Sequence, residues 1–299
     1  YDGYYGRGAH GRAYLWDANH DEPIQTYAHD DYVHGAALVR DDKFVLTYSR
    51  DGSVRLWDME RKQAPKILRH RHAVEHAILA PDGAALLAWT RDGAARLWGL
   101  ADKPADKPLR VFEHDGHPLS AKLSPDGSRV LAYSTYGDTI RLWGVERQKP
   151  LRTFRLPVDV DGAALSPNAQ RLFAFADDYG AWFWDVDRPE PLLTIEQKKW
   201  FSHPLFNADG TRLFVWTSEQ AWLLDVERGR VLETFDQKHR AQQAVFVGDS
   251  IRVLSWHNFD NVVQLWDPRR ERPLRTLRLK RDVKGALMNF DATRVLTWT

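Results

Sequence analysis

The sequence predicts an all-β fold made of seven repeated units, and three observations lead to this prediction. A tryptophan or its substitute recurs at intervals of 41, 41, 45, 41, 40 and 42 residues. Runs of five to seven residues rich in Val, Leu, Phe, Trp and Thr lie between these positions, with no sustained helical period. A turn such as Pro81-Asp82-Gly83 follows the first strand of several units, where Asp caps the turn and Gly accepts a positive φ. Each unit is therefore predicted to form four short antiparallel strands.

The recurring positions identify the family that the chain resembles. They are Trp16, Trp57, Trp98, Trp143, Trp184, Leu224 and Trp266. Segments such as Arg55-Leu56-Trp57-Asp58 and Leu265-Trp266-Asp267 resemble the repeats of WD-repeat proteins, and the resemblance covers the whole chain. It implies a seven-bladed β-propeller with four antiparallel strands in each blade.

A second pattern marks the outer strand of each blade. Pro150-Leu151-Arg152-Thr153-Phe154 has counterparts that begin at Pro108, Pro191 and Pro273. The order of elements then predicts how the ring closes. Strands near 285–288 and 294–298 supply the first half of a blade, and strands over 12–17 and 23–28 supply the second half. We therefore expect one domain over 1–299, whose closing blade is built from about 1–29 and 284–299, with no edge left open.

Composition narrows the classes of function. Lys and Arg number 42 and Asp and Glu 41, so a net charge of +1 provides no global field for nucleic acid or an anionic membrane. There is no cysteine, which excludes disulfides and thiolate chemistry, and no apolar run approaches a membrane span of about 20 residues. The chain begins at Tyr1 without an initiator Met or a signal pattern. We expect a cytoplasmic part of a larger polypeptide.

The family resemblance also implies a hydrogen-bonded tetrad within a blade. Carried onto this sequence, it consists of His29, Thr47, Asp51 and Trp57. In the next repeat, Ala88 stands where the hydroxyl belongs. His, Thr and Asp side chains together could indicate hydrolysis, but here they recur as part of a sheet scaffold, and we favour a structural role. No catalytic residue is expected.

A large aromatic follows the tetrad hydroxyl position in every repeat. These residues are Tyr48, Trp89, Tyr133, Phe175, Trp216, Trp256 and Trp298. Alternation along a strand sends them to the face opposite the tetrad, so we interpret them as a packing layer between blades rather than a ligand-binding ring.

Two groups of histidines are candidate metal ligands, because His70, His72 and His76 cluster, as do His114 and His117. Neither group shows a helical His pair flanking a Glu, so solvated loop histidines are favoured. We expect no metal and no cofactor.

Recognition is expected on the loops that enter the inner strands and on the turns before the third strands, where propellers usually bind. The candidate partner-binding residues are Tyr32, His34, Arg50, Glu75, Arg91, Lys199, Trp200, Phe201, Arg240, Phe259 and Lys284. Arg50 and Arg91 directly precede the turn aspartates, and Trp200 and Phe201 follow two lysines, a composition typical of interface hot spots.

The sequence therefore predicts a non-catalytic scaffold or sensor. Its expected partners are a protein or peptide and the other domains of a larger polypeptide. Segment 294–298, preceded by 283–287, is similar to repeats of bacterial multidomain signalling or defence proteins. The alternative is a propeller enzyme or small-ligand binder acting at the central channel, although inner strands that begin Gly35-Ala36-Ala37 and Gly162-Ala163-Ala164 provide little chemistry there. Nucleic-acid binding through the arginines between 269 and 281 is a third, less favoured class.

Overall fold

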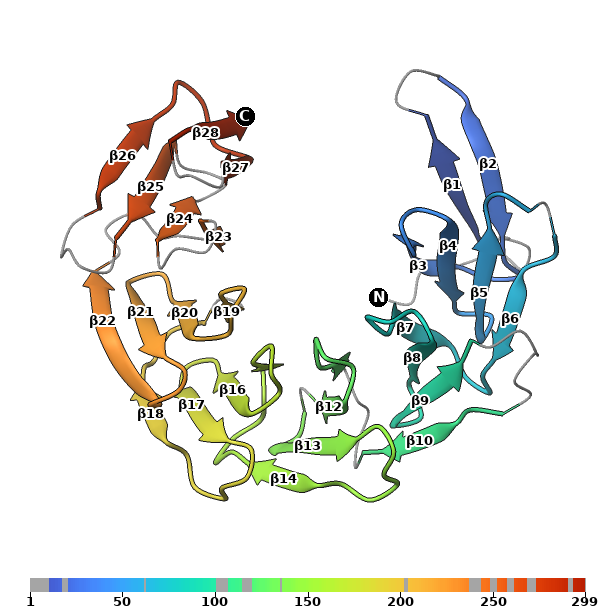
Figure 1. Ribbon diagram of the computed structural model, residues 1–299, viewed down its shortest axis with the longest axis horizontal. Coiled ribbons are helices and arrows are strands. Elements are labelled where there is room, and N and C mark those ends of the chain that lie inside the picture. The colour runs from blue at the N-terminus through green and yellow to red at the C-terminus, as the bar shows by residue number, and fades with distance from the viewer. Residues whose placement is uncertain are drawn as a thin grey trace. The chain divides into compact units, whose positions relative to one another are not determined.

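The computed structural model describes residues 11–17, 21–61, 63–100, 107–114, 120–134, 136–201, 204–236, 243–247, 252–256, 261–267, 273–289 and 293–298. It forms two compact units, Tyr1–Arg155 and Leu156–Thr299, each a series of antiparallel sheets (Figure 1). None of the described residues belongs to a helix, so none belongs to a helix able to span a membrane. The all-β prediction is confirmed for these residues.

The first unit contains a two-stranded sheet followed by three four-stranded sheets, β3 to β6, β7 to β10 and β11 to β14. Its strands are β1 (Arg12–Trp16), β2 (Pro23–Ala28), β3 (Val33–Val39), β4 (Phe44–Ser49), β5 (Ser53–Asp58), β6 (Lys66–Arg69), β7 (Val74–Leu79), β8 (Ala85–Thr90), β9 (Ala94–Gly99), β10 (Arg110–Glu113), β11 (Ser120–Leu123), β12 (Arg129–Tyr133), β13 (Thr139–Gly144) and β14 (Arg152–Arg155).

The second unit contains three four-stranded sheets, β15 to β18, β19 to β22 and β23 to β26, followed by a two-stranded one. Its strands are β15 (Gly162–Leu165), β16 (Arg171–Ala176), β17 (Gly180–Asp185), β18 (Leu193–Glu196), β19 (Leu205–Phe206), β20 (Arg212–Trp216), β21 (Gln220–Asp225), β22 (Arg230–Asp236), β23 (Gln243–Phe246), β24 (Val253–Trp256), β25 (Val262–Trp266), β26 (Arg275–Arg278), β27 (Gly285–Met288) and β28 (Val295–Trp298).

Each core lies between neighbouring sheets rather than inside one sheet. Leu87 and Trp89 of β8 pack against Val130 and Trp143 of the next sheet, and Phe214 and Trp216 of β20 pack against residues of β24 and β25. The strands pair with their sequence neighbours, so consecutive side chains alternate between the two faces of a sheet. The second and third strands of the four-stranded sheets are therefore largely buried.

The aromatic layer expected from the sequence is present, and three of its rings lie opposite a glycine of the inner strand. Tyr48 lies opposite Gly35, Phe175 opposite Gly162, and Trp298 opposite Gly285. A Cβ on any of these glycines would overlap the facing ring. The ring therefore lies over a bare stretch of backbone on the inner strand.

Among the described residues, two turns after inner strands depart from the Asp-Gly pattern, and in one of them, between β3 and β4, Arg40, Asp41 and Asp42 have φ of 55°, 53° and 61°. Gly83, Gly127 and Gly210 have φ of 69°, 70° and 70°, as the turn sequences predict. Ala169 occupies the same place in the turn between β15 and β16 with φ 55°, a left-handed conformation that disfavours residues with a Cβ.

The two-stranded sheets leave apolar side chains uncovered. The repeat tryptophan Trp16 is 55% exposed, whereas its counterparts Trp98 and Trp266 are 3% and 4% exposed. In the last strand Trp298 is 46% exposed, although the other six members of the aromatic layer are at most 8% exposed. The predicted pairs β1–β2 and β27–β28 are confirmed, while their union in a seventh blade stays a prediction.

The glycine under the aromatic ring gives a stability prediction. Gly162→Ala should lower the free energy of unfolding by about 1–3 kcal/mol, because the new methyl group overpacks against the Phe175 ring. Urea denaturation measures this change, and adding Phe175→Leu should restore part of the loss. Gly144→Ala is the control, because its Cβ would meet no atom closer than 3.7 Å. Equal effects of the two Gly→Ala variants would contradict this account of the layer.

Candidate functional site

The four residues expected to form a tetrad come together in one blade. His29 follows β2, Thr47 lies on β4, Asp51 in the turn after it, and Trp57 on β5. The Trp57 indole N–H donates to Thr47 Oγ1 at 2.9 Å, and Thr47 Oγ1 lies 2.7 Å from His29 Nε2. His29 Nδ1 lies 3.0 Å from Asp51 Oδ2. With the proton on Nδ1, His29 donates to Asp51 and accepts from Thr47. Each of the three hydrogen bonds between these four side chains then joins one donor to one acceptor.

The protonation states support a scaffold. Burial alone would raise the pKa of Asp51, but hydrogen bonds from Ser53, His29 and the Asp30 backbone outweigh burial and bring it to about 2. Burial lowers the pKa of His29 despite the carboxylate beside it. A neutral imidazole and a charged Asp51 therefore persist at neutral pH. Because His29 and Thr47 are at most 1% exposed, no substrate reaches the hydroxyl, and the arrangement holds strands together rather than hydrolysing a bond.

Sequence reasoning missed the cation that completes this network. Arg55 of β5 places its guanidinium 3.1 Å from Asp51 Oδ2 and also donates to the Ala28 carbonyl. Arg96 pairs with Asp92 in the same way in the next blade, at 2.5 Å. The Arg-Leu-Trp segment, which recurs in three repeats, was the available indication.

The next blade compensates for its missing hydroxyl. Ala88 stands in place of Thr47, and the Trp98 indole N–H donates directly to His70 Nε2 at 3.0 Å. The pKa of His70 falls to about 4, first because of burial and then because of the Arg96 charge. The expectation that the clustered histidines are solvated is wrong for His70.

Two other histidines are also packed. The His76 ring stacks on Trp89 at 4.8 Å, with 8° between the planes, and lies 4.9 Å from the Tyr48 ring. His114 is 6% exposed, and its Nε2 lies 3.3 Å from the Thr139 carbonyl. Of the described members, His72 in a loop and His76 on β7 are exposed, while His117 lies outside the described residues. The ring of His76 nevertheless lies against the aromatic rings of Tyr48 and Trp89.

The candidate binding residues of the first unit lie on its strand-connecting loops or next to them. Arg50 is 3.8 Å from Asp31, which follows β2, and its side chain is 58% exposed. Arg91 forms an ion pair with Glu75 and keeps 73% of its side chain exposed. Tyr32 is 37% exposed, and His34 Nδ1 lies 2.8 Å from the Val74 carbonyl of the neighbouring blade. These side chains form a polar, partly paired edge.

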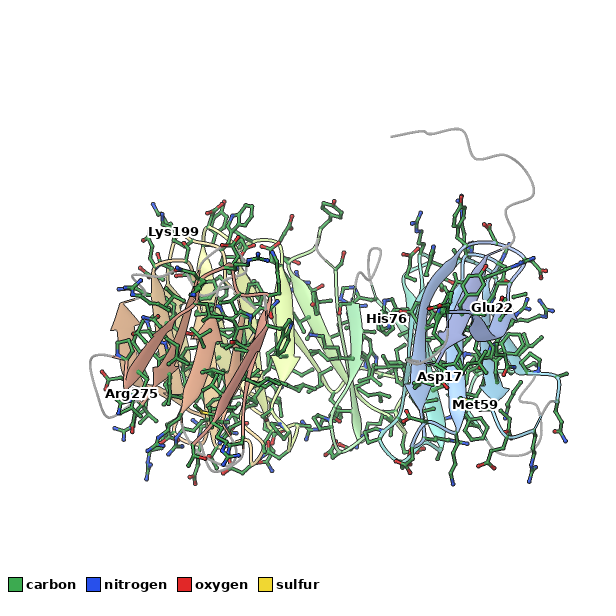
Figure 2. All side chains as sticks on the ribbon, turned by 90° about the horizontal axis from the view of Figure 1, so that it is seen from above. Asp17, Glu22, Met59, His76, Lys199 and Arg275 are labelled. Carbon is green, nitrogen blue, oxygen red and sulfur yellow. The ribbon has the colours of Figure 1, made fainter. Side chains whose placement is uncertain are left out.

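In the second unit the loop between β18 and β19 carries the predicted lysine and aromatics. Lys199 pairs with Glu219 at 2.9 Å, and Trp200 is 73% exposed. Figure 2 places Lys199 at the edge of this unit opposite to Arg275. Phe201 does not lie at the surface as the predicted contact residue should, because it is only 7% exposed. Its ring centroid lies 5.8 Å from that of Phe175 and 5.9 Å from that of Trp222, and its backbone N–H donates to the Asp177 carboxylate.

Of the remaining predicted contact residues, the structure describes Lys284 but not Arg240 or Phe259. Lys284 precedes β27 with an exposed side chain, and its amide donates to the Trp298 carbonyl. Arg240 and Phe259 lie outside the described residues, as do Arg269, Arg270 and Arg272 of the nucleic-acid alternative.

Two hollows that meet at Tyr179 were not predicted. One has a volume of about 670 Å³ and includes Pro157, Trp182 and Lys198, and the other, of about 330 Å³, includes Asp159, Asp161 and Asp177. Tyr179, in the turn between β16 and β17, is 61% exposed. Burial and then the charges of Asp161 and Asp178 raise the pKa of Asp177. The fold brings the turn that carries Tyr179 beside the loops before β15 and after β18.

Among the residues that the structure describes, no three His, Asp or Glu side chains come together as a metal-binding group. In comparison with known families, the model of the WD domain, G-beta repeat matches residues 21–58, which span β2 to β5 and include the whole tetrad. The match supports a WD-repeat family. Curated proteins include none with a significant match to this chain. WD-repeat β-propellers are generally non-enzymatic scaffolds for protein interactions, and the repeated sheets described above fit that architecture.

The tetrad gives a second stability prediction. Thr47→Val keeps the shape of the side chain but removes both hydrogen bonds of the hydroxyl, so His29 and Trp57 each lose a buried partner. We expect the free energy of unfolding to fall by about 2 kcal/mol in urea denaturation. Thr153→Val, on the exposed side of β14, should change it by less than about 0.5 kcal/mol. A silent Thr47→Val would show that the network contributes no stability.

Proposed function

We propose that this WD-repeat chain is a non-catalytic, cytoplasmic scaffold or sensor that binds a protein or peptide within a larger bacterial signalling or defence protein. The family match supports the coarse class, and the similarity of segments 283–287 and 294–298 to bacterial multidomain proteins motivates the finer one. The tetrad supports the absence of catalysis, because its hydroxyl is buried and committed to the sheet.

The observation that carries the binding proposal is the loop edge of the second unit. Trp200 and Tyr179 present large aromatic rings to solvent, and the larger hollow opens beside Tyr179 and Trp182. A monomeric protein gains no stability from a tryptophan that is 73% exposed, whereas aromatic side chains dominate the binding energy of interfaces. Lys198 and the aspartates of the smaller hollow supply the polar surroundings of such a contact.

We also propose that the ring has seven blades and that β1–β2 and β27–β28 together form the seventh. Two observations support this closure. Each pair supplies two strands where the other blades have four, and each exposes the apolar residues that the other blades bury, Trp16 in one pair and Trp298 in the other. Pairing them would cover both faces and remove the open edges.

Closure predicts protected tryptophans in solution. In a closed monomer Trp16 and Trp298 should be shielded from iodide, so Trp16→Phe and Trp298→Phe should remove slowly quenched fluorescence, and the radius of gyration should be about 19 Å. Iodide quenching and small-angle X-ray scattering measure these properties. If both tryptophans are rapidly quenched, or if the chain is a dimer by light scattering with both protected, closure within one chain is wrong.

The binding proposal is tested by capture of a partner from the native source with the 1–299 chain as bait. Trp200→Ala should lower retention of a specifically bound protein at least tenfold, because the loss of a hot-spot aromatic costs about 2 kcal/mol or more. Retention is measured by quantitative mass spectrometry of the bound fraction.

The matched control is Arg188→Ala, which changes a turn between β17 and β18, at the other end of these strands from Trp200. It should leave retention unchanged. Equal losses in both variants, or none in Trp200→Ala, would contradict the proposed binding edge.

A further inference from the structure

The turn between β16 and β17 lacks the arginine that neutralises the corresponding turns of two sheets in the first unit. In the first of those sheets, Arg55 pairs with Asp51 at 3.1 Å, four residues earlier in the chain, and the next sheet repeats the pair. Asp178 occupies the position of Asp51, because each acid lies six residues before its repeat tryptophan. Four residues after Asp178, however, stands Trp182. The acid of this turn therefore has no arginine in its own sheet.

Other carboxylates gather beside this turn from three elements of the chain. Asp159 and Asp161 belong to the loop before β15, Asp177 to the turn itself, and Glu196 to the end of β18. Among the described residues that line the two hollows, the only basic one is Lys198, and it lines the larger hollow alone. Neither Asp159 nor Glu196 forms an ion pair with a described residue. The hollows therefore carry an excess of negative charge, which favours a cationic occupant.

The arrangement of these carboxylates does not suit a metal ion. Within the described part of the chain, no three Asp, Glu or His side chains come together as a metal-binding group. Two of the carboxylates also accept backbone N–H groups, Asp161 from Asp177 and Asp177 from Phe201, so their positions are fixed by the loops. A cation that meets carboxylates spread along a hollow is an extended organic group.

The aromatic wall shared by the two hollows favours a guanidinium group. Tyr179 lines both hollows and is 61% exposed, and Trp182 lines the larger one. A guanidinium stacks on an aromatic face and binds carboxylates through its planar fork of N–H groups, whereas an ammonium is compact and strongly hydrated. The smaller hollow, at about 330 Å³, lies at the lower end of the range of ligand pockets and suits one long side chain.

We propose that the smaller hollow binds an arginine side chain of a partner peptide, whose guanidinium stacks on Tyr179 and pairs with the aspartates of that hollow. The next residue of the peptide lies in the larger hollow, beside Trp182. The inference rests on the protein- or peptide-binding function proposed above and names the chemistry of the partner. The partner's arginine supplies to this turn the charge that Arg55 supplies within its own sheet.

The test is a titration of the ¹⁵N-labelled 1–299 chain with N-acetyl-L-arginine methylamide, followed by transverse-relaxation-optimised NMR. Its readouts are the Trp182 indole N–H and the Tyr179 backbone N–H, assigned with Trp182→Phe and with Tyr179→Phe in tyrosine-labelled chain. Both signals should move saturably. N-acetyl-L-citrulline methylamide, which has the same shape without the charge, should leave them in place. N-acetyl-L-lysine methylamide should bind at least threefold more weakly than the arginine probe.

Variants separate a specific pairing from general attraction. Asp159→Asn should weaken the arginine probe roughly twofold to fivefold, because one partly exposed ion pair is lost. Tyr179→Ser should have an effect of similar size, because it removes the ring under the guanidinium. The matched control is Glu190→Gln, which removes one exposed negative charge in the loop at the other end of β17 and should leave affinity unchanged. An unchanged Trp266 indole signal in each variant checks the fold.

Three results would overturn the proposal. They are no saturable movement of either signal, movement by the citrulline or lysine probe at the same concentrations as by arginine, and equal weakening in Glu190→Gln and Asp159→Asn. Because the probe needs no partner protein, probe binding without any captured partner would count against the proposed function alone. Capture of a partner that depends on Trp200 but not on Asp159, without probe binding, would count against the arginine site alone.

Discussion

The four-stranded sheets depend on packing against their neighbours within each unit. Their second and third strands carry large apolar side chains such as Leu87, Val130 and Phe214, and a single sheet of four short strands cannot bury these by itself. Large aromatic rings lie between neighbouring sheets. Where a glycine on the inner strand accepts the ring, as Gly162 accepts Phe175, the ring lies directly against the backbone of that strand. Local pairing and packing between sheets are therefore one constraint.

The polar interactions tolerate more variation than the apolar ones. His29, Thr47, Asp51 and Trp57 form a complete chain of hydrogen bonds in one blade. In the next blade the hydroxyl is absent and the indole donates to the histidine directly. What is preserved is a partner for the buried indole, and not a fixed set of residues. The indoles of Trp216 and Trp256 differ in this respect, because neither N–H has a hydrogen-bond partner among the residues that the structure describes.

Much of the architecture could be predicted from the sequence, because the spacing of the repeats and the sequences of the turns are local features. The spacing of the repeat tryptophans predicts the number of strands, and the Asp-Gly turns predict where the inner hairpins reverse. The packing of the aromatic layer also followed from alternation along a strand. The burial of Phe201 could not be predicted, because it depends on the Asp177 carboxylate, 24 residues away in sequence, which anchors its backbone. The hollows around Tyr179 likewise require three loops to meet, and no single segment encodes that.

Two-stranded sheets at opposite ends of the chain have a consequence for synthesis. The segment β1–β2 leaves the ribosome before the other described strands, with Trp16 and Ile24 uncovered. Under the proposed closure, its covering strands begin 257 residues after β2 ends, which corresponds to roughly 13 to 50 s at elongation rates of about 5–20 residues per second. For that interval the nascent chain carries an unpaired apolar hairpin. Slower translation would lengthen the exposure, so the yield of folded protein should depend on translation speed and on chaperones that shield this hairpin.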